Sequence, residues 1–295
     1  MSTTIATKTI VSYGAGLDST AVLVEMYNRG WRPDLILFAD PGAEHPETYD
    51  YIPIMNTWLR SVGFPEITVV RYQPTRVAYW SLEEKCLRNE TLPSLAYGGS
   101  FHSCALVFKR DTQDKFLKIW AAPHVAAGGK LVHVIGYDSS VSDLKRAGKA
   151  NKLHAAMRAS IAKRAAEGKK PLASQWSVAN GVYAYPLQDW GLERGQLAAI
   201  VEAAGLPVPR KSCCYFCPAS KPAEVVELRQ NHPELFERAV AIEDRARTGK
   251  HGLKTKQGLG MGGWSWNWLR DVDDPAEAAG VLRARGARVG DTLRP

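Results

Sequence analysis

The sequence lacks the marks of a membrane-bound or exported protein. Its 295 residues include no run of about 18 apolar residues, which is the length that a membrane-spanning helix requires. Residues 1–8 are rich in Ser and Thr and contain no apolar signal core. We therefore expect a cytoplasmic protein with no membrane partner. Apolar residues make up 45% of the chain and charged residues 23%, which is the composition of an ordinary globular protein.

Cysteine is scarce, and its number is odd. Disulfides are rare in the cytosol, and three cysteines within five positions favour metal or redox chemistry instead. The spacing of Cys214 and Cys217, C-x-x-C, lets two thiolates face one metal, and all-thiolate ligation selects zinc or an iron–sulfur cluster. Structural zinc, simple buried thiols and a C-x-x-C disulfide remain open alternatives. The candidate ligands are Cys104, Cys213, Cys214 and Cys217, and the remaining cysteine, Cys86, is expected to serve packing only.

Positive charge is concentrated in one stretch. The net charge of the chain is +8, and residues 145–170 contain nine Lys or Arg residues against one acid, Glu167. A local basic stretch can bind the phosphates of tRNA or DNA. The alternative is a solvated, lysine-rich helix. In either case Leu153, Met157 and Ile161, at a spacing of four residues, would give the helix one apolar stripe.

Short apolar runs alternate with helical patterns along most of the chain. This order predicts a parallel, Rossmann-like sheet with helices on both faces. The expected domains are an α/β domain over 1–205 and a mainly helical, cysteine-containing region over 206–295. The expected strands are 8–12, 35–39, 67–71, 131–136 and 182–186. The expected helices are 18–28, 46–59, 142–167 and 193–205, with one or two more within 222–247.

The C-terminal region contains three alternating tryptophans, Trp264, Trp266 and Trp268. Aromatic residues that alternate along a strand are usually core residues, which is the expectation here. The alternative is that they stack on nucleic-acid bases.

A glycine turn follows the first expected strand. Small residues let backbone N–H groups approach an anion closely, and the N-terminus of the next helix adds its positive dipole end. A P-loop is excluded because no lysine precedes Ser19, and a dinucleotide fingerprint would need glycine at that position. The candidate nucleotide-binding residues of this turn are Ser12, Tyr13, Gly14, Ala15, Gly16, Leu17, Asp18, Ser19 and Thr20.

The run Gly14–Ser19, G-A-G-L-D-S, resembles the PP-loop S-G-G-x-D-S of the N-type ATP pyrophosphatases. Gly14 and Ala15 stand where that motif has Ser and Gly, so Ser12 is the candidate to replace the missing serine. Three further segments resemble the phosphoadenosine phosphosulfate (PAPS) reductase family, and a fourth, Gly136-Tyr137-Asp138 with Arg146, does so loosely. The three are Phe38–Gly42 with Pro46–Tyr49, Tyr185–Trp190, and His102-Ser103-Cys104 with Lys109. The resemblance covers residues 8 to 220 and implies a HUP-type fold.

The resemblance also implies chemistry. A PP-loop enzyme directs attack on the α-phosphate of ATP, or of a related adenosine nucleotide, and releases pyrophosphate from an adenylated substrate. Mg²⁺ bridges the phosphates, and Asp18 and Asp40 are candidates to orient it, with helix capping and a turn as their structural alternatives. Cys104 and Lys109 match a catalytic segment. Gly42, Gly136 and Arg146 are further candidate nucleotide contacts.

Among the cysteine chemistries, the resemblance favours a [4Fe–4S] cluster. No cysteine follows Cys217, so the C-terminal cysteine motif that PAPS reductases use for catalysis is missing. The first hypothesis is therefore adenylation followed by sulfur transfer to tRNA or DNA, with a sulfur donor protein as partner. The second is a sulfonucleotide reductase that uses Cys213 or Cys104. The third is a non-catalytic nucleic-acid-binding protein with structural zinc.

Overall fold

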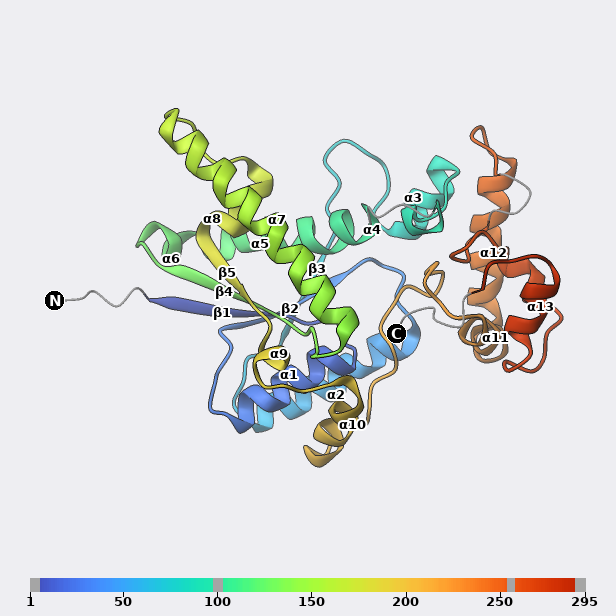
Figure 1. Cartoon of the computed structure of the whole chain (residues 1–295), viewed down its shortest axis with the longest axis horizontal. Coiled ribbons are helices and arrows are strands. Elements are labelled where there is room, and N and C mark those ends of the chain that lie inside the picture. Colours follow the sequence, from blue (N-terminus) through green and yellow to red (C-terminus); the bar gives the residue numbers. More distant parts are fainter. Residues whose placement is uncertain (1–5, 98–102, 254–257, 290–295) are drawn as a thin grey trace. The chain divides into compact units, whose positions relative to one another are not determined.

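The computed structural model describes residues 6–97, 103–253 and 258–289, and it consists of two compact units that interleave along the chain (Figure 1). The first unit comprises residues 1–39, 46–70 and 111–212. The second comprises residues 40–45, 71–110 and 213–295. The chain therefore passes between the units several times, the last time after Ser212. The division into 1–205 and 206–295 stays a prediction.

A five-stranded parallel sheet forms the centre of the first unit, which confirms the predicted fold class. The strand order is β3-β2-β1-β4-β5. Ile10 in the central strand pairs with Leu35 on one side and with His133 on the other. The strands are β1 (Thr7–Ser12), β2 (Leu35–Asp40), β3 (Ile67–Arg71), β4 (Lys130–Ile135) and β5 (Gly181–Ala184).

Helices cover both faces of this sheet because neighbouring strand residues point to opposite sides. Val11 belongs to the core that β1 shares with α1 (Leu17–Asn28) and α2 (Pro46–Ser61). The adjacent Ile10 belongs to a separate core on the other face, together with Leu117 of α5 (Asp111–Trp120). The shorter helical segments of the unit are α6 (Ala122–Ala126), η3 (Ala173–Gln175), α8 (Trp176–Asn180) and α9 (Pro186–Asp189), and α10 (Arg194–Ala203) packs on α1.

The long basic helix α7 (Val141–Ala166) lies beside strand β5 (Figure 1). Its buried side contains Asp143 and Ala147, and His154 stacks on Tyr183 of β5 with ring centroids 4.0 Å apart. The predicted stripe is wrong at Leu153, whose side chain is 49% exposed. The physical reason is that His154, the next residue along the helix, makes the contact with the sheet, which turns Leu153 about 100° away from it.

The second unit is mainly helical and has its own core. Two helices occupy the range where one or two were predicted, because Pro233 ends the first and begins the second. Trp264 and Trp266 are completely buried, which confirms them as core residues, but Trp266 and Trp268 lie on a 3₁₀ turn and not on a strand. The elements are α3 (Leu82–Asn89), η1 (Ser94–Tyr97), α4 (Ser103–Ala105), η2 (Leu106–Arg110), α11 (Pro222–Asn231), α12 (Pro233–Thr248), η4 (Trp266–Leu269) and α13 (Ala278–Ala284).

Within the described residues, no helix combines the length and the apolar character needed to cross a membrane.

The buried His133 on β4 should make the stability of the protein sensitive to acid. Burial, with His154 nearby, lowers the pKa of His133 from 6.5 to about 4. The pKa of His133 is lower in the folded chain than in the unfolded chain. The stability that the neutral His133 provides is therefore complete above pH 6.5 and is lost as the pH falls towards 4. The expected loss is about 3 kcal/mol. Urea unfolding at pH 7 and pH 4.5 should show a smaller loss for His133→Phe than for the wild type, and equal losses would contradict the assignment.

Candidate functional site

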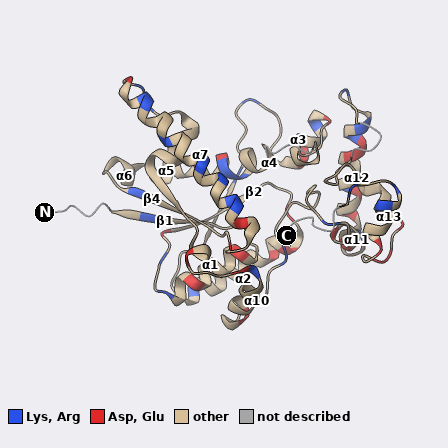
Figure 2. Cartoon of the chain, viewed as in Figure 1, with Lys and Arg blue, Asp and Glu red and all other residues tan. Residues whose placement is uncertain are grey.

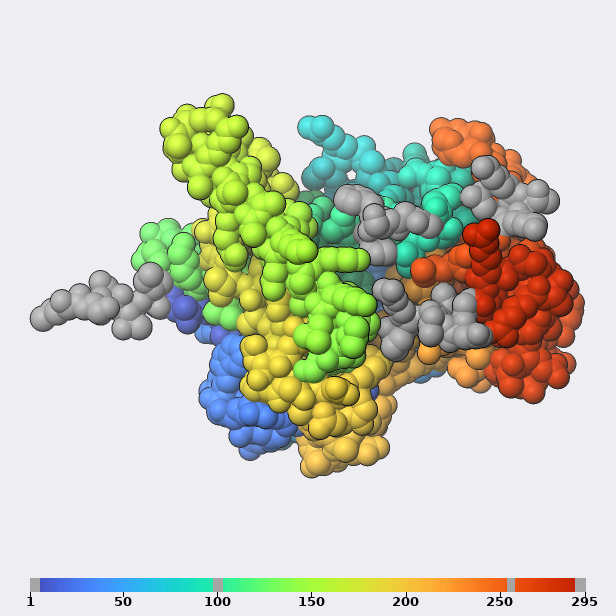
Figure 3. All heavy atoms as spheres, in the orientation of Figure 1, coloured from blue at the N-terminus to red at the C-terminus, as the bar shows by residue number. Residues whose placement is uncertain are grey.

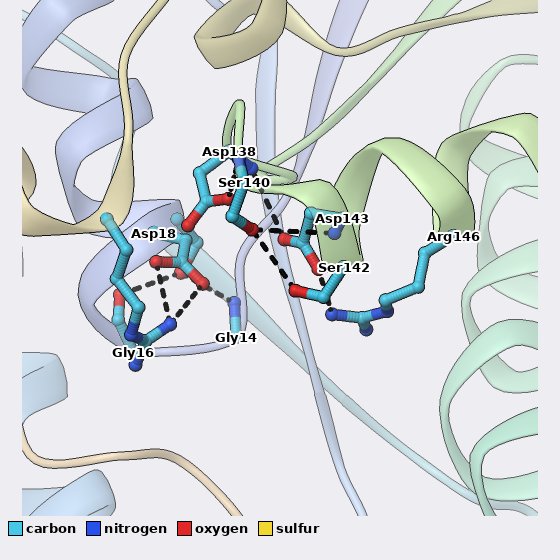
Figure 4. Close-up of polar contacts among 10 residues, drawn as sticks. Gly14, Gly16, Asp18, Asp138, Ser140, Ser142, Asp143 and Arg146 are labelled. Carbon is cyan, nitrogen blue, oxygen red and sulfur yellow. Dashed lines mark hydrogen bonds and ion pairs between the residues drawn. The ribbon is translucent and has the colours of Figure 1, made fainter. Parts of the chain in front are cut away.

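The loop between β1 and α1 is closed by its own hydrogen bonds. The Gly14 N–H donates to Ser19 Oγ at 3.1 Å, and Ser19 Oγ donates to the Gly16 carbonyl oxygen at 3.1 Å (Figure 4). Gly16 is the N-cap of α1 and makes no side-chain capping bond among the described residues. The first N–H groups of α1 therefore have no capping side chain. Helix N-termini with such uncapped N–H groups are typical anion-binding sites.

Two positions at this site restrict the size of the residue they accept, one in the loop and one directly after β4. Ala15 has a φ of 57°, in the left-handed region that glycine adopts most easily, and it stands where the PP-loop motif has glycine. At the end of β4, a Cβ on Gly136 would lie 3.0 Å from both the carbonyl carbon of Asp18 and the nitrogen of Ser19. Because Gly136 has no side chain, the end of β4 can approach the backbone of the first turn of α1 closely.

Asp18 carries the charge of this loop. Arg194, the first residue of α10, donates to both of its carboxylate oxygens, at 3.1 and 3.0 Å. Burial nevertheless raises the pKa of Asp18, and Asp138 and Asp143 raise it further, while Arg194 opposes them. Sequence reasoning did not single out Arg194, whose only signal was its position at the start of the helix after Tyr185–Trp190.

A second group of polar residues follows β4 and faces Asp18 (Figure 4). The Asp138 N–H donates to Asp143 at 3.2 Å, and Ser140 caps α7 by accepting from the Asp143 N–H. Arg146 donates to Asp143 at 2.7 Å and lies over the ring of Tyr137 at 4.5 Å. The predicted nucleotide contact Arg146 is thus brought to the loop side of the sheet, already paired with a carboxylate.

Three of the predicted nucleotide-binding residues of the loop have side chains that bond to other side chains of the protein. The hydroxyls of Tyr13 and Thr20 lie 3.2 Å apart in the core, and burial raises the pKa of Tyr13. Ser12 donates to Gln113 at 3.1 Å. Tyr13 and Thr20 therefore pack the loop onto the sheet with their side chains, and Ser12 has a protein partner.

The last residue of β2, Asp40, and the residues after it belong to the second unit. Asp40 is buried, accepts from the Gly42 N–H at 2.7 Å and pairs with Arg71 at 2.8 Å. Gly42 has a φ of 75°, and a Cβ there would lie 2.9 Å from the Cβ of Ser81. Both predicted residues thus shape a tight turn, which is the structural alternative for Asp40.

A lysine, a glutamate and three cysteines meet in the second unit. Lys109, on the π-helical turn η2, donates to the buried Glu44 at 2.8 Å. Glu44 forms an isolated antiparallel bridge with Cys214, whose carbonyl oxygen accepts from the Cys217 N–H. Burial lowers the pKa of Lys109, but Glu44 and the sulfurs of Cys214 and Cys217 outweigh it and raise the pKa above its usual value. Sequence reasoning found Lys109 and missed Glu44.

The thiols of this group influence one another. Burial raises the pKa of Cys214 well above its usual value, followed by Glu44, and Cys217 and Cys213 add to the effect, while Lys109 opposes it. Cys213 and Cys217 therefore both lie within electrostatic range of Cys214. As arranged, however, the described residues contain no group of three or more His, Cys, Asp or Glu side chains placed to hold a metal ion.

Cys104 has a different neighbour. It lines a cavity of about 220 Å³ together with Cys86, Lys85, Ser94 and Tyr97. Burial raises the pKa of Cys86 to about 12, and Cys104 adds to the shift. Cys86 is a buried core residue, and none of the five cysteines is in a disulfide. The role of Cys104 as fourth ligand stays a prediction, and His102 of the same segment lies outside the described residues.

Comparison with known proteins names no family for this chain. No protein-family model matches it, and no curated protein matches its sequence. Among solved structures it is similar to the U34-tRNA thiolase NcsA from Methanococcus maripaludis with its [4Fe–4S] cluster, at 17% identity and a TM-score of 0.39. The match covers 86% of this chain and 76% of that one. A likeness this distant transfers no residue role, so the place of the chain among PAPS reductase-like PP-loop proteins stays a prediction.

Proposed function

We propose that the first unit binds ATP at the loop Gly14–Ser19 and cleaves it between the α- and β-phosphates. The observation that carries this proposal is the uncapped N-terminus of α1 behind a glycine loop, against which Gly136 packs without a side chain. Phosphate oxygens would accept from the free N–H groups of this helix end. Catalysis would depend on holding the nucleotide and neutralising charge at the α-phosphate.

The charged residues around the loop suit a nucleotide with its cation. Asp138 and Asp143 raise the free energy of the charged form of Asp18, so a cation beside Asp18 would be stabilised there. These carboxylates offer the oxygen ligands that Mg²⁺ prefers, and the ion would supply positive charge at the phosphates. Arg194 bonds to Asp18 now and could exchange that partner for a phosphate oxygen.

The substrate that we propose is a nucleic acid, which the enzyme adenylates before sulfur is transferred to it. The basic helix α7 supports a polyanionic substrate, and the three clustered cysteines beside Lys109 support sulfur chemistry. The sulfur source would be a donor protein.

The cysteines fit an iron–sulfur cluster in their chemistry but do not form a completed ligand set. Cys213, Cys214 and Cys217 provide three thiols in one short segment, and Cys104 shares a cavity with Cys86. We propose these three as the cluster ligands. Such a cluster would hold or deliver sulfide.

The experiment that tests ATP cleavage follows the phosphates separately. Protein purified without oxygen is incubated with Mg²⁺ and ATP labelled at the α- or the γ-phosphate, with and without tRNA or duplex DNA. We expect AMP or an adenylated product together with pyrophosphate in equal amounts. Release of ADP and inorganic phosphate would contradict the proposal, because it places the cleavage at the wrong bond.

A further inference from the structure

Four lysines of helix α7 lie on the same face of the helix. At about 100° per residue, Lys145, Lys149, Lys152 and Lys163 fall within an arc of about 60°. All four side chains are exposed. We refer to these four residues as the lysine face. Figure 2 shows the positive charge distributed along α7.

The lysine face lies opposite the side of α7 that packs on the protein. Asp143, Ala147 and His154 mark the packed side, about 160° to 200° around the helix from Lys145. The lysine face therefore contributes nothing to holding α7 in place. Asp143 is the only acidic residue of α7 and already pairs with Arg146. Among the described residues, no carboxylate forms an ion pair with the lysine face, so these charges are available to a partner.

We propose that the lysine face is a docking surface for double-stranded DNA, which deepens the proposed function by naming the partner. Lys145 and Lys163 are about 27 Å apart along the helix axis. That distance corresponds to about eight base pairs at 3.4 Å each. A duplex of that length presents phosphates along the whole lysine face, and neutralising them releases bound counterions.

The composition of α7 favours a duplex over a single strand. Single strands are held by aromatic side chains that stack on the bases, and α7 contains no Phe, Tyr or Trp. Contact would therefore be with the phosphate backbone and independent of sequence.

The shape of α7 favours DNA over duplex RNA. Ala155, Ala156, Ala159 and Ala162 are exposed and keep the C-terminal half of the helix slim. This half projects from the surface of the first unit (Figure 3). A helix of about 10 Å diameter can enter the major groove of B-DNA, which is about 12 Å wide. The narrow major groove of A-form RNA would not admit it.

The test measures binding of a labelled 24-base-pair duplex DNA by fluorescence anisotropy, without ATP, between 50 and 200 mM salt. The test protein carries Lys145→Ala, Lys149→Ala and Lys152→Ala. The matched control carries Lys130→Ala, Lys221→Ala and Lys250→Ala, which are exposed lysines elsewhere and change the net charge equally. Replacing three phosphate-binding lysines should make the slope of log K against log salt shallower by about 2.7. The control should bind like the wild type, and circular dichroism checks that both variants are folded.

Several outcomes would overturn the proposal. Equal losses in both variants would mean that only net charge matters. Tighter binding of a matched RNA duplex, of a single strand or of anionic lipid vesicles would replace DNA as the partner. Wild-type protein that binds duplex DNA but cleaves no ATP would overturn the proposed function and leave this inference standing. The reverse pattern would overturn only this inference.

Discussion

Replacing Asp18 by Asn should lower ATP cleavage by about 100-fold or more, because the variant loses the charge that orients the cation at the phosphates. The amide keeps the size of the side chain and one oxygen for Arg194. Pyrophosphate release at saturating ATP measures the effect. Asp50→Asn, an exposed substitution on α2, is the matched control and should retain wild-type activity. Wild-type cleavage by Asp18→Asn would remove Asp18 from the catalytic proposal.

The same substitution should not destabilise the protein. The folded state raises the pKa of Asp18, with burial as the largest cause, so its charged form is less favourable in the folded than in the unfolded chain. This cost appears as the pH rises through the unfolded and then the folded pKa, and it is complete at neutral pH. Asp18→Asn removes it, and the melting temperature at pH 7 should equal or exceed that of the wild type. A lower melting temperature would mean that the bond to Arg194 outweighs the cost.

Replacing Cys214 by Ala should abolish cluster binding. Wild-type protein reconstituted with iron and sulfide under anaerobic conditions should contain about four of each per chain, as a [4Fe–4S] cluster requires. The variant should contain almost none, because both of the other proposed ligands, Cys213 and Cys217, act on Cys214 and its loss would leave only two of the three thiols. Iron and sulfide analysis together with the visible absorption of the cluster measure the result.

Two other cysteine variants complete this experiment. Cys86→Ala is the matched control, because Cys86 is buried beside Cys104, and it should keep its iron. Cys104→Ala should also keep its iron if Cys213, Cys214 and Cys217 are the only protein ligands. Loss of iron in Cys104→Ala would make Cys104 the fourth ligand. A colourless wild-type protein that binds zinc alone would contradict the cluster.

The sheet and the glycine turn that follows its first strand could be predicted from the sequence because their signals are local. The apolar run Leu35–Ala39 is continuous because β2 is buried on both faces, and that requirement is written into consecutive residues. The turn Gly14–Ser19 is equally local, since small residues and a following helix suffice to identify it. The stripe through Leu153 failed because a helical pattern shows which residues are apolar but not which face meets the sheet.

The sequence by itself determined the parallel α/β fold, the place of the glycine turn Gly14–Ser19 and the grouping of three cysteines within five positions. Only the tertiary structure decided which residues from distant parts of the sequence lie beside the turn and the cysteines. Arg194 reaches Asp18 across 176 positions, and Lys109 reaches Glu44 across 65. It also decided that Cys104 lies beside Cys86. The physical reason is that strand and turn preferences act between neighbours along the chain, whereas an ion pair depends on where the packing of separate elements places two side chains.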